Sequence, residues 1–315
     1  MSFDISAFDR YPKLQSILAE ICRVWPEHAG YCESRFRNDQ PAALSRSEEV
    51  ADLVHRLADV HSITEHCADY RWMCERFLEE ELIFRRTGKY RLATFRDAYE
   101  QVYSRHDYMS RYVRGILISQ LVWHPHALAF EFFRSRFLAL CPPGSRHLEI
   151  GPGHGLFLYF ASQSPNITGL EAWDVSESSI SATRSALTKL GVSMDVKLTL
   201  QDVLAASPAT APFDSAIISE VLEHLEHPER ALATLRASLR PGGRLFINAP
   251  VNSPAPDHIY LWSSPDEFVT WVRAQDFEIE ASEYYPVTGA SLERAMRQKL
   301  SISCVVVARR PHFTS

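Results

Sequence analysis

One short segment, residues 147–155, constrains the fold more than any other part of the chain. It reads His-Leu-Glu-Ile-Gly-Pro-Gly-His-Gly. Leu148 and Ile150 give a short strand its apolar side, and the turn that follows lacks a Cβ atom at every second position. Such a turn can adopt positive φ and lets a ligand approach the backbone closely. The three positions are Gly151, Gly153 and Gly155. A glycine loop alone also serves helix packing, so its meaning depends on the segments downstream.

Strand and helix signals alternate through the rest of the chain. Asp174 follows a buried strand at roughly the 20-residue distance that places an acid beside a ribose in a βαβ unit. Ser176 is placed to cap the next helix, and Gly191 to end it. The expected elements are a helix at 156–162, a strand at 167–175, a helix at 177–190, strands at 195–200 and 215–219, a helix at 228–239, a strand at 244–248, a helix at 264–274, and strands at 277–281 and 301–308.

Residues 1–140 carry a different pattern, because apolar residues recur there with the period of an α-helix and strand signals are few. The predicted helical stretches are 14–24, 50–60, 70–84, 95–103, 112–122 and 128–138. The chain therefore divides into a helical region, 1–140, and an α/β region, 141–315.

The order of motifs in the α/β region closely resembles that of class I S-adenosylmethionine-dependent methyltransferases, over residues 145 to 310. The segment Glu-Val-Leu-Glu-His-Leu at 220–225 is most similar to the ubiquinone-biosynthesis-type small-molecule branch. The resemblance implies a Rossmann-like sheet of seven strands, mostly parallel, in which the antiparallel last strand lies between the fifth and sixth. It also implies that the helical region covers the cofactor and supplies either acceptor contacts and a lid or a homodimer surface. The motifs are 148–155, 174–176, 201–202, 213–228 and 239–243.

The same resemblance implies S-adenosylmethionine as cofactor and S-adenosylhomocysteine as product. Glu149 would orient the glycine loop, which would contact the methionine moiety. Asp174 would bind the ribose hydroxyls, Asp202 would meet the adenine amino group, and Glu220 would lie beside the sulfonium. The expected cofactor-binding residues are Glu149, Gly151, Gly153, Gly155, Asp174, Val175, Asp202, Val203 and Glu220.

Physical chemistry supports this reading independently, because these acids fall at the carboxyl ends of strands, where open α/β sheets bind ligands. A cofactor with a sulfonium and an ammonium group favours carboxylates, whereas a pyrophosphate favours a helix N-terminus and nearby cations. An acid-rich pocket therefore disfavours a nicotinamide-dependent oxidoreductase. A catalytically silent methyltransferase-fold partner protein is the other alternative, and the intact glycines and Asp174 speak against it.

His224 is the first candidate for the catalytic base, because it follows the fourth strand and a histidine titrates near neutral pH. Tyr112, Ile116 and Trp123 are expected in the core. Further catalytic candidates are His106 and Tyr108. Candidates for binding the acceptor, a small polar or aromatic molecule or a carboxylate of a specialised biosynthetic pathway, are Arg111, His124, Asn252, His258 and Tyr260.

Composition limits the remaining possibilities. The net charge of −6 offers no broad basic surface, so a nucleic-acid partner is not expected. No apolar stretch approaches the length of a membrane span, and a cytoplasmic location is expected. The six cysteines lack metal-ligand spacing. No metal is expected, because the candidate ligands Glu220, Glu223, His224 and His227 lack a further partner in the sequence.

Overall fold

Seven strands form one sheet in the computed structural model, which describes residues 3–58, 62–205 and 211–312. The strand order is β3-β2-β1-β4-β5-β7-β6, and β7 runs antiparallel to both of its neighbours. The expected insertion of the last strand between the fifth and sixth is therefore confirmed. The strands are β1 Ser145–Ile150, β2 Ile167–Asp174, β3 Val196–Leu200, β4 Phe213–Ser219, β5 Leu239–Val251, β6 Glu278–Pro286 and β7 Ile302–Arg309.

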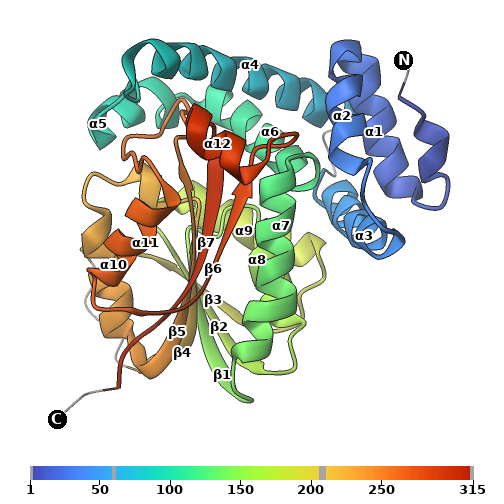
Figure 1. Ribbon diagram of the computed structural model, residues 1–315. Coiled ribbons are helices and arrows are strands. Elements are labelled where there is room, and N and C mark those ends of the chain that lie inside the picture. Colours follow the sequence, from blue (N-terminus) through green and yellow to red (C-terminus); the bar gives the residue numbers. More distant parts are fainter. Residues whose placement is uncertain (1–2, 59–61, 206–210, 313–315) are drawn as a thin grey trace.

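Helices cover both faces of the sheet, and each face has its own hydrophobic core (Figure 1). One core contains Phe157 of α8, Phe130 of α7 and Phe246 of β5. The other contains Leu232 of α10 and Phe268 of α11. The helices of this half are α7 His124–Phe132, α8 Leu156–Ser162, α9 Glu177–Lys189, α10 Pro228–Ser238, α11 Pro265–Arg273 and α12 Leu292–Gln298.

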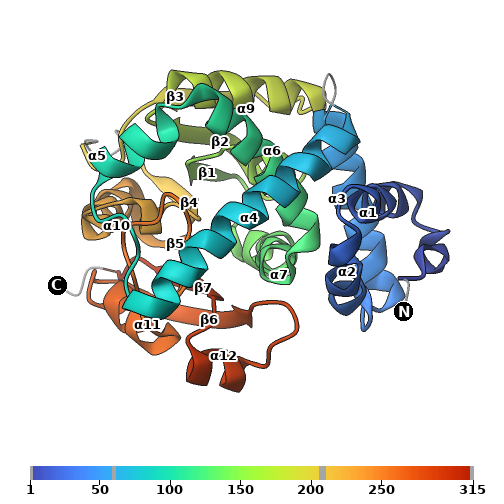
Figure 2. The ribbon, with the colours of Figure 1, turned by 90° about the horizontal axis from the view of Figure 1, so that it is seen from above.

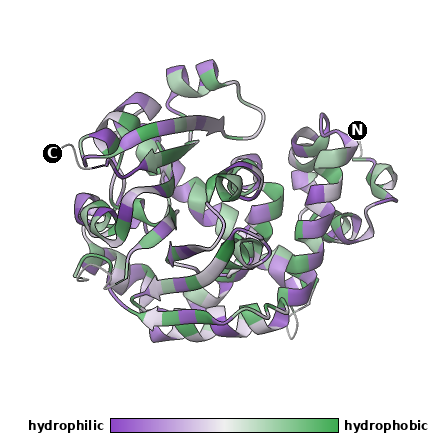
Figure 3. Cartoon of the chain, turned by 90° about the horizontal axis from the view of Figure 1, so that it is seen from below, coloured by the Kyte–Doolittle hydropathy of each residue, from purple (hydrophilic) through white to green (hydrophobic). Residues whose placement is uncertain are grey.

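The alternation of side chains along the central strands explains why both faces are apolar. Successive residues of a strand point to opposite faces, so a strand covered on both sides must be apolar at every position. Val305 and Val307 of β7 contribute to one core, while Val306 contributes to the other. In Figure 3 the helices carry hydrophobic and hydrophilic bands side by side, as expected for elements with one covered face.

Helices α4, α5 and α6 lie over the carboxyl ends of the strands, with α4 crossing above them, and α1, α2 and α3 lie to one side of the sheet (Figures 1 and 2). We call α4 and α6 together the roof. Helix α4 begins with a capping box between Ser62 and Glu65 and ends at Gly88, which has a φ of 68°. The helices before α7 are α1 Pro12–Val24, α2 Ala29–Phe36, α3 Pro41–Ala58, α4 Ile63–Thr87, α5 Phe95–Ala98 and α6 His106–Val122.

The two roof helices pack closely at Gly115 of α6. A Cβ atom built there would lie 2.9 Å from Cβ of Met73 and 3.1 Å from the carbonyl oxygen of Asp69. Gly115→Ala is therefore expected to lower the free energy of unfolding by about 1–3 kcal/mol, measured by urea denaturation. Gly30→Ala is the matched control, because Gly30 lies in α2 with no atom within 4 Å of its added Cβ. Equal stabilities of the two variants would contradict this packing.

The expected elements of the α/β region are present, and β5 extends further in both directions than the predicted strand at 244–248. The predicted helix at 50–60 is the second half of α3, and its expected end at Val60 lies outside the described residues. Among the residues that the structure describes, no helix combines the length and the apolar character needed to cross a bilayer.

Candidate functional site

A cavity of about 740 Å³ lies between the roof and the carboxyl ends of β1, β4 and β5. This volume is typical of a ligand pocket. Its floor and sides come from the glycine loop, from the segment after β4 and from the loop after β5. Aromatic side chains line the roof side: Tyr70, Phe77, Tyr103, Tyr112 and Trp123.

The glycine loop leaves β1 with left-handed backbone at all three glycines. A Cβ atom on Gly151, whose φ is 66°, would lie 2.8 Å from the Val221 side chain. Gly151 and Gly153 line the cavity, and Gly155 instead begins α8. The predicted close approach of backbone to ligand is therefore available at the first two glycines.

Glu149 lines the cavity from the end of β1 and is almost fully buried, with 3% of its surface exposed. Its Oε2 atom has no hydrogen-bond partner among the described residues. Burial raises the pKa of this carboxyl well above its usual value. A buried acid without a partner is suited to receiving a cationic group of a ligand.

Glu220 follows β4 with a φ of 53°, which is uncommon for a residue other than glycine and is often found at functional sites. Its backbone N–H donates to the carbonyl of Asn248, and Nδ2 of Asn248 donates to its carboxylate at 3.0 Å. Ser303 in turn donates to Oδ1 of Asn248. Burial raises the pKa of Glu220 to about 7. These contacts hold an acid in a defined position in the cavity wall.

His224 joins the segment after β4 to the loop after β5. Its Nδ1 lies 3.2 Å from the carbonyl oxygen of Asp257 and 3.2 Å from the hydroxyl of Tyr103. Tyr103 and Tyr112 donate to the two carboxylate oxygens of Asp257 at 3.1 and 3.0 Å. His224, Tyr103 and Asp257 all line the cavity. A polar cluster thus connects the roof to the end of the sheet.

Four other histidines of the cavity are neutral at neutral pH, because burial lowers each pKa. The pKa falls to about 4 for His28, His126 and His154 and to about 3 for His258. No lysine or arginine side chain lines the cavity in the described part of the chain. The space beside the glycine loop is therefore polar in places but carries no fixed positive charge.

The predicted adenosine contacts lie outside this cavity. Asp174 accepts hydrogen bonds from the backbone N–H of Ser176 at 2.9 Å and from the hydroxyl of Ser179 at 2.6 Å, so it also anchors the start of α9. Val175 is 60% exposed, and Val203 belongs to the hydrophobic core. Asp202 is exposed and accepts from the N–H of Leu204. The ribose and adenine roles of these residues remain predictions.

The structure does not place the first-turn candidates of α6 at the cavity. The side chain of His106 is 95% exposed. Tyr108 packs edge-on against Trp72 and beside Tyr112. Arg111 donates to Asp69 at 2.7 Å and lies over the Trp72 ring. None of the three lines the cavity, because His106 points to solvent, Tyr108 packs on Trp72 and Arg111 is held by Asp69 of α4.

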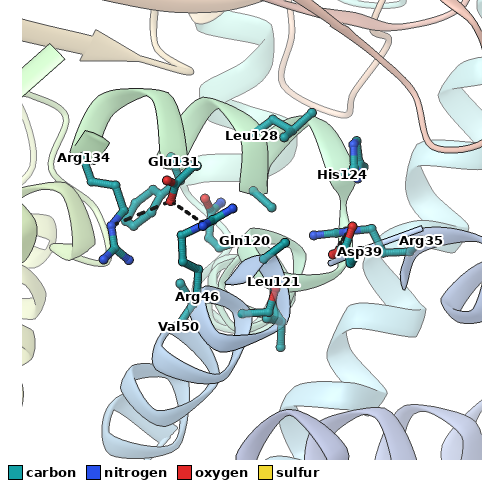
Figure 4. A pocket seen from close by; sticks show the side chains of 14 residues that line it. Arg35, Asp39, Arg46, Val50, Gln120, Leu121, His124, Leu128, Glu131 and Arg134 are labelled. Carbon is teal, nitrogen blue, oxygen red and sulfur yellow. Dashed lines mark hydrogen bonds and ion pairs between the residues drawn. The ribbon is translucent and has the colours of Figure 1, made fainter. Parts of the chain in front are cut away.

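The other predicted acceptor-binding residues do not all lie at the cavity. Figure 4 shows His124 in a separate, smaller pocket of about 70 Å³, beside Arg35 and Asp39. Asn252 points its amide to the carbonyl of Ser263, and Tyr260 packs on Trp262. Of the five predicted acceptor-binding residues, His258 lines the cavity.

The sequence did not predict that one face of α6 lines the cavity. Tyr112 belongs to the core and Ile116 and Trp123 pack against it, as expected, but all three also line the cavity together with Met109 and Gln120. Their spacing along α6 is that of one helical face. This apolar stripe was visible in the sequence, but a stripe that packs on a core and a stripe that faces a ligand look the same.

The segment after β4, which carries the four candidate ligands named from the sequence, forms a short 3₁₀ turn, Leu222–His224. His227 turns outward, with 61% of its side chain exposed, and pairs with Glu229. The neighbour of Glu223 and His224 is instead His258 from the loop after β5.

The comparison with known proteins agrees with the geometry. Residues 125–299, more than half of the chain, match the family model described as a methyltransferase domain. The ubiquinone biosynthesis O-methyltransferase of Xylella fastidiosa strain 9a5c is 33% identical over an alignment of 195 residues, and the match covers 54% of this chain and 77% of that protein. The protein of the same name from Hahella chejuensis is 26% identical over an alignment of 157 residues, and the match covers 44% of this chain and 64% of that protein.

Solved structures with a similar chain path include the YcgJ protein of Bacillus subtilis, with 15% identity, a TM-score of 0.48, and coverage of 60% of this chain and all of that one. Another is the N-methyltransferase NodS of Bradyrhizobium japonicum in complex with S-adenosyl-L-homocysteine, with 21% identity, a TM-score of 0.43, and coverage of 58% and 88%. The family match, the sheet order and the glycine loop lead to one conclusion. The chain belongs to the methyltransferase-domain family and is a class I S-adenosylmethionine-dependent methyltransferase.

Proposed function

We propose that this enzyme transfers the methyl group of S-adenosylmethionine to an oxygen atom of an uncharged, flat small molecule held under the roof. The observation that carries the proposal is the shared cavity, into which Gly151, Glu149 and His224 open together with an aromatic wall. The relatives named as O-methyltransferases support oxygen as the acceptor atom. The electron pair of the acceptor oxygen forms the new O–CH₃ bond as the S–CH₃ bond breaks, the electrons of the broken bond stay on the sulfur of S-adenosylhomocysteine, and the hydroxyl proton passes to His224 as the proposed base.

The cavity suits a neutral acceptor better than the carboxylate that the sequence suggested. Arg111, the predicted acceptor-binding arginine, and Arg114 beside it both donate to Asp69 of α4, and no guanidinium of the described residues lines the cavity. Aromatic rings are good partners for a flat apolar molecule. A carbon or nitrogen acceptor would fit the same walls, so the choice of oxygen depends on the relatives.

Calorimetry with the purified chain tests the proposal, using S-adenosylmethionine, S-adenosylhomocysteine and NADH as ligands. Micromolar affinity for the first two and none for NADH is the expected result, followed by methyl transfer from labelled cofactor to neutral phenols in preference to aromatic carboxylates. Binding of none of the three would favour the silent-partner alternative, and NADH binding would revive the oxidoreductase.

We further propose that residues 1–140 select the acceptor and that Asp174, Asp202 and Glu220 bind the cofactor. A cytoplasmic location fits the six cysteines, which are all free thiols. The alternative role of residues 1–140 is to form a homodimer surface. Analytical ultracentrifugation of the full chain distinguishes a dimer from a monomer.

Cofactor affinity is expected to depend on pH through Glu149. In the free enzyme burial raises the pKa of Glu149 and favours its protonated form, whereas a bound ammonium group favours the carboxylate. Binding should therefore release a proton, and affinity should rise as the pH rises towards that raised pKa. Calorimetry in buffers of different ionisation enthalpy measures the number of protons released.

Glu149→Gln is expected to release fewer protons and to bind the cofactor about tenfold more weakly, since a charge-assisted hydrogen bond is replaced by a neutral one. Glu293→Gln is the matched control, because Glu293 is 86% exposed on α12. Proton release that is unchanged in Glu149→Gln would remove Glu149 from this role.

A further inference from the structure

A row of aromatic rings runs along the roof side of the cavity, from the polar cluster around His224 to the N-terminal helices. Each ring contacts the next, and all of them line the cavity. The centroid distances are 6.1 Å from Tyr112 to Phe77, 5.3 Å from Phe77 to Trp123, 6.4 Å from Trp123 to Tyr70 and 5.5 Å from Tyr70 to His28. The row therefore connects the proposed base with His28, which lies in the turn between α1 and α2.

The ring of His28 is held between two aromatic neighbours. Its centroid lies 3.9 Å from that of Trp25, with 11° between the ring planes, and 4.5 Å from that of Tyr31, with 19°. Tyr31 is itself tied to the other half of the chain, because its hydroxyl lies 2.9 Å from Oγ1 of Thr288 in the loop between β6 and α12. Stacking between two rings leaves the imidazole little freedom to tilt, so its two nitrogens keep fixed directions.

The hydrogen bonds of Tyr70 determine which nitrogen of His28 carries the proton. Nε1 of Trp123 can only donate and lies 2.9 Å from the Tyr70 hydroxyl, so Tyr70 accepts this bond. The hydroxyl proton of Tyr70 is then available to Nε2 of His28, 3.1 Å from the same oxygen. His28 is neutral, because burial lowers its pKa to about 4. A neutral imidazole that accepts at Nε2 carries its proton on Nδ1.

Nδ1 of His28 has no hydrogen-bond partner among the residues that the structure describes. The ring is half-buried and lines the cavity, whereas Tyr70 is fully buried. A ligand that displaces water from this donor must offer an acceptor in exchange, since an N–H left unpaired in an apolar place is costly. His28 therefore presents one directed donor to whatever lies along the aromatic row.

We propose that His28 is a specificity-determining residue, whose Nδ1–H donates to a carbonyl oxygen of the acceptor remote from the hydroxyl that is methylated. This inference rests on the proposed function and narrows the acceptors to flat, uncharged phenols with a second, hydrogen-bond-accepting group. Tyr70 and Trp123 are positioning residues, because they select the tautomer of His28. A neutral carbonyl suits this place better than a carboxylate, since no lysine or arginine of the described residues lines the cavity.

Two flat phenols with the same ring skeleton test the proposal, a hydroxyanthraquinone and the hydroxyanthracene with its hydroxyl at the same carbon. Calorimetry measures the affinity of each for the full-length protein saturated with S-adenosylhomocysteine. His28→Phe keeps a flat ring between Trp25 and Tyr31 but removes the donor. The ratio of the two affinities is expected to favour the quinone about tenfold more in the wild type than in His28→Phe, since only the quinone can accept from His28.

Tyr70→Phe separates positioning from packing. Nitrogen NMR of the imidazole is expected to show His28 protonated on Nδ1 in the wild type and as a mixture of tautomers in Tyr70→Phe. The preference for the quinone should fall in this variant as well. A purely structural role of Tyr70 would instead lower the affinity for both phenols alike and leave their ratio unchanged.

His312→Phe is the matched control, because it makes the same replacement at an exposed position. Affinity for S-adenosylmethionine shows that each variant is folded. An equal ratio in the wild type and His28→Phe, binding of neither phenol, or a wild-type His28 protonated on Nε2 would overturn the inference. If the wild-type protein binds S-adenosylmethionine without the expected ratio, the role of His28 alone fails; if it does not bind S-adenosylmethionine, the proposed function fails.

Discussion

Replacement of His224 by alanine is expected to slow methyl transfer by about a hundredfold or more, the usual contribution of a group that assists proton removal. The imidazole lies in the cavity, and its contacts to Asp257 and Tyr103 orient it there. Cofactor affinity should change little, because the cofactor contacts proposed for Gly151 and Glu149 lie elsewhere. Turnover and calorimetric affinity of the same preparation separate the two effects.

The control for this variant is His312→Ala, which removes an exposed imidazole near the C-terminus. It is expected to turn over like the wild type. A His224→Ala enzyme with unaltered turnover would exclude His224 from the reaction. A variant that lost cofactor affinity as well would indicate a structural role for the contacts between the roof and the sheet.

Asp174→Asn is expected to weaken S-adenosylmethionine binding by about thirtyfold. Two hydrogen bonds from ribose hydroxyls to a charged acceptor would become neutral bonds, at a cost of about 1 kcal/mol each. Asparagine is preferable to alanine, because its side chain can still accept from the N–H of Ser176 at the start of α9. Calorimetric affinity measures the effect, and thermal unfolding shows whether α9 remains anchored.

Glu177→Gln removes the same charge from an exposed position three residues further along the chain. A similar loss of affinity in this control would indicate a general electrostatic effect. Unchanged affinity in Asp174→Asn would refute the ribose assignment.

The α/β half was predictable because its signals are local. Strand β1, its glycine loop and α8 are contiguous in the sequence, so the placement of Glu149 and Gly151 follows from one short segment. The antiparallel insertion of β7 followed instead from the family resemblance, since strand order depends on packing between distant segments.

The residues that line the acceptor part of the cavity were harder to predict from the sequence. Arg111 looked available for a carboxylate because its partner, Asp69, lies on another helix. His106 lies on the solvent-facing side of the first turn of α6, and the sequence alone does not show which side of that turn faces the cavity. Asp257 and His258 meet His224 only through the return of the loop after β5.

The glycine loop and the aromatic side chains line the same cavity, so the cofactor and the acceptor would bind next to each other in it. Occupancy by either ligand then alters the free energy of binding the other, and this coupling is the same in both directions. An acceptor can therefore be recognised by its effect on cofactor affinity alone. Candidate molecules can be ranked with unreactive S-adenosylhomocysteine in place, before any product has been detected.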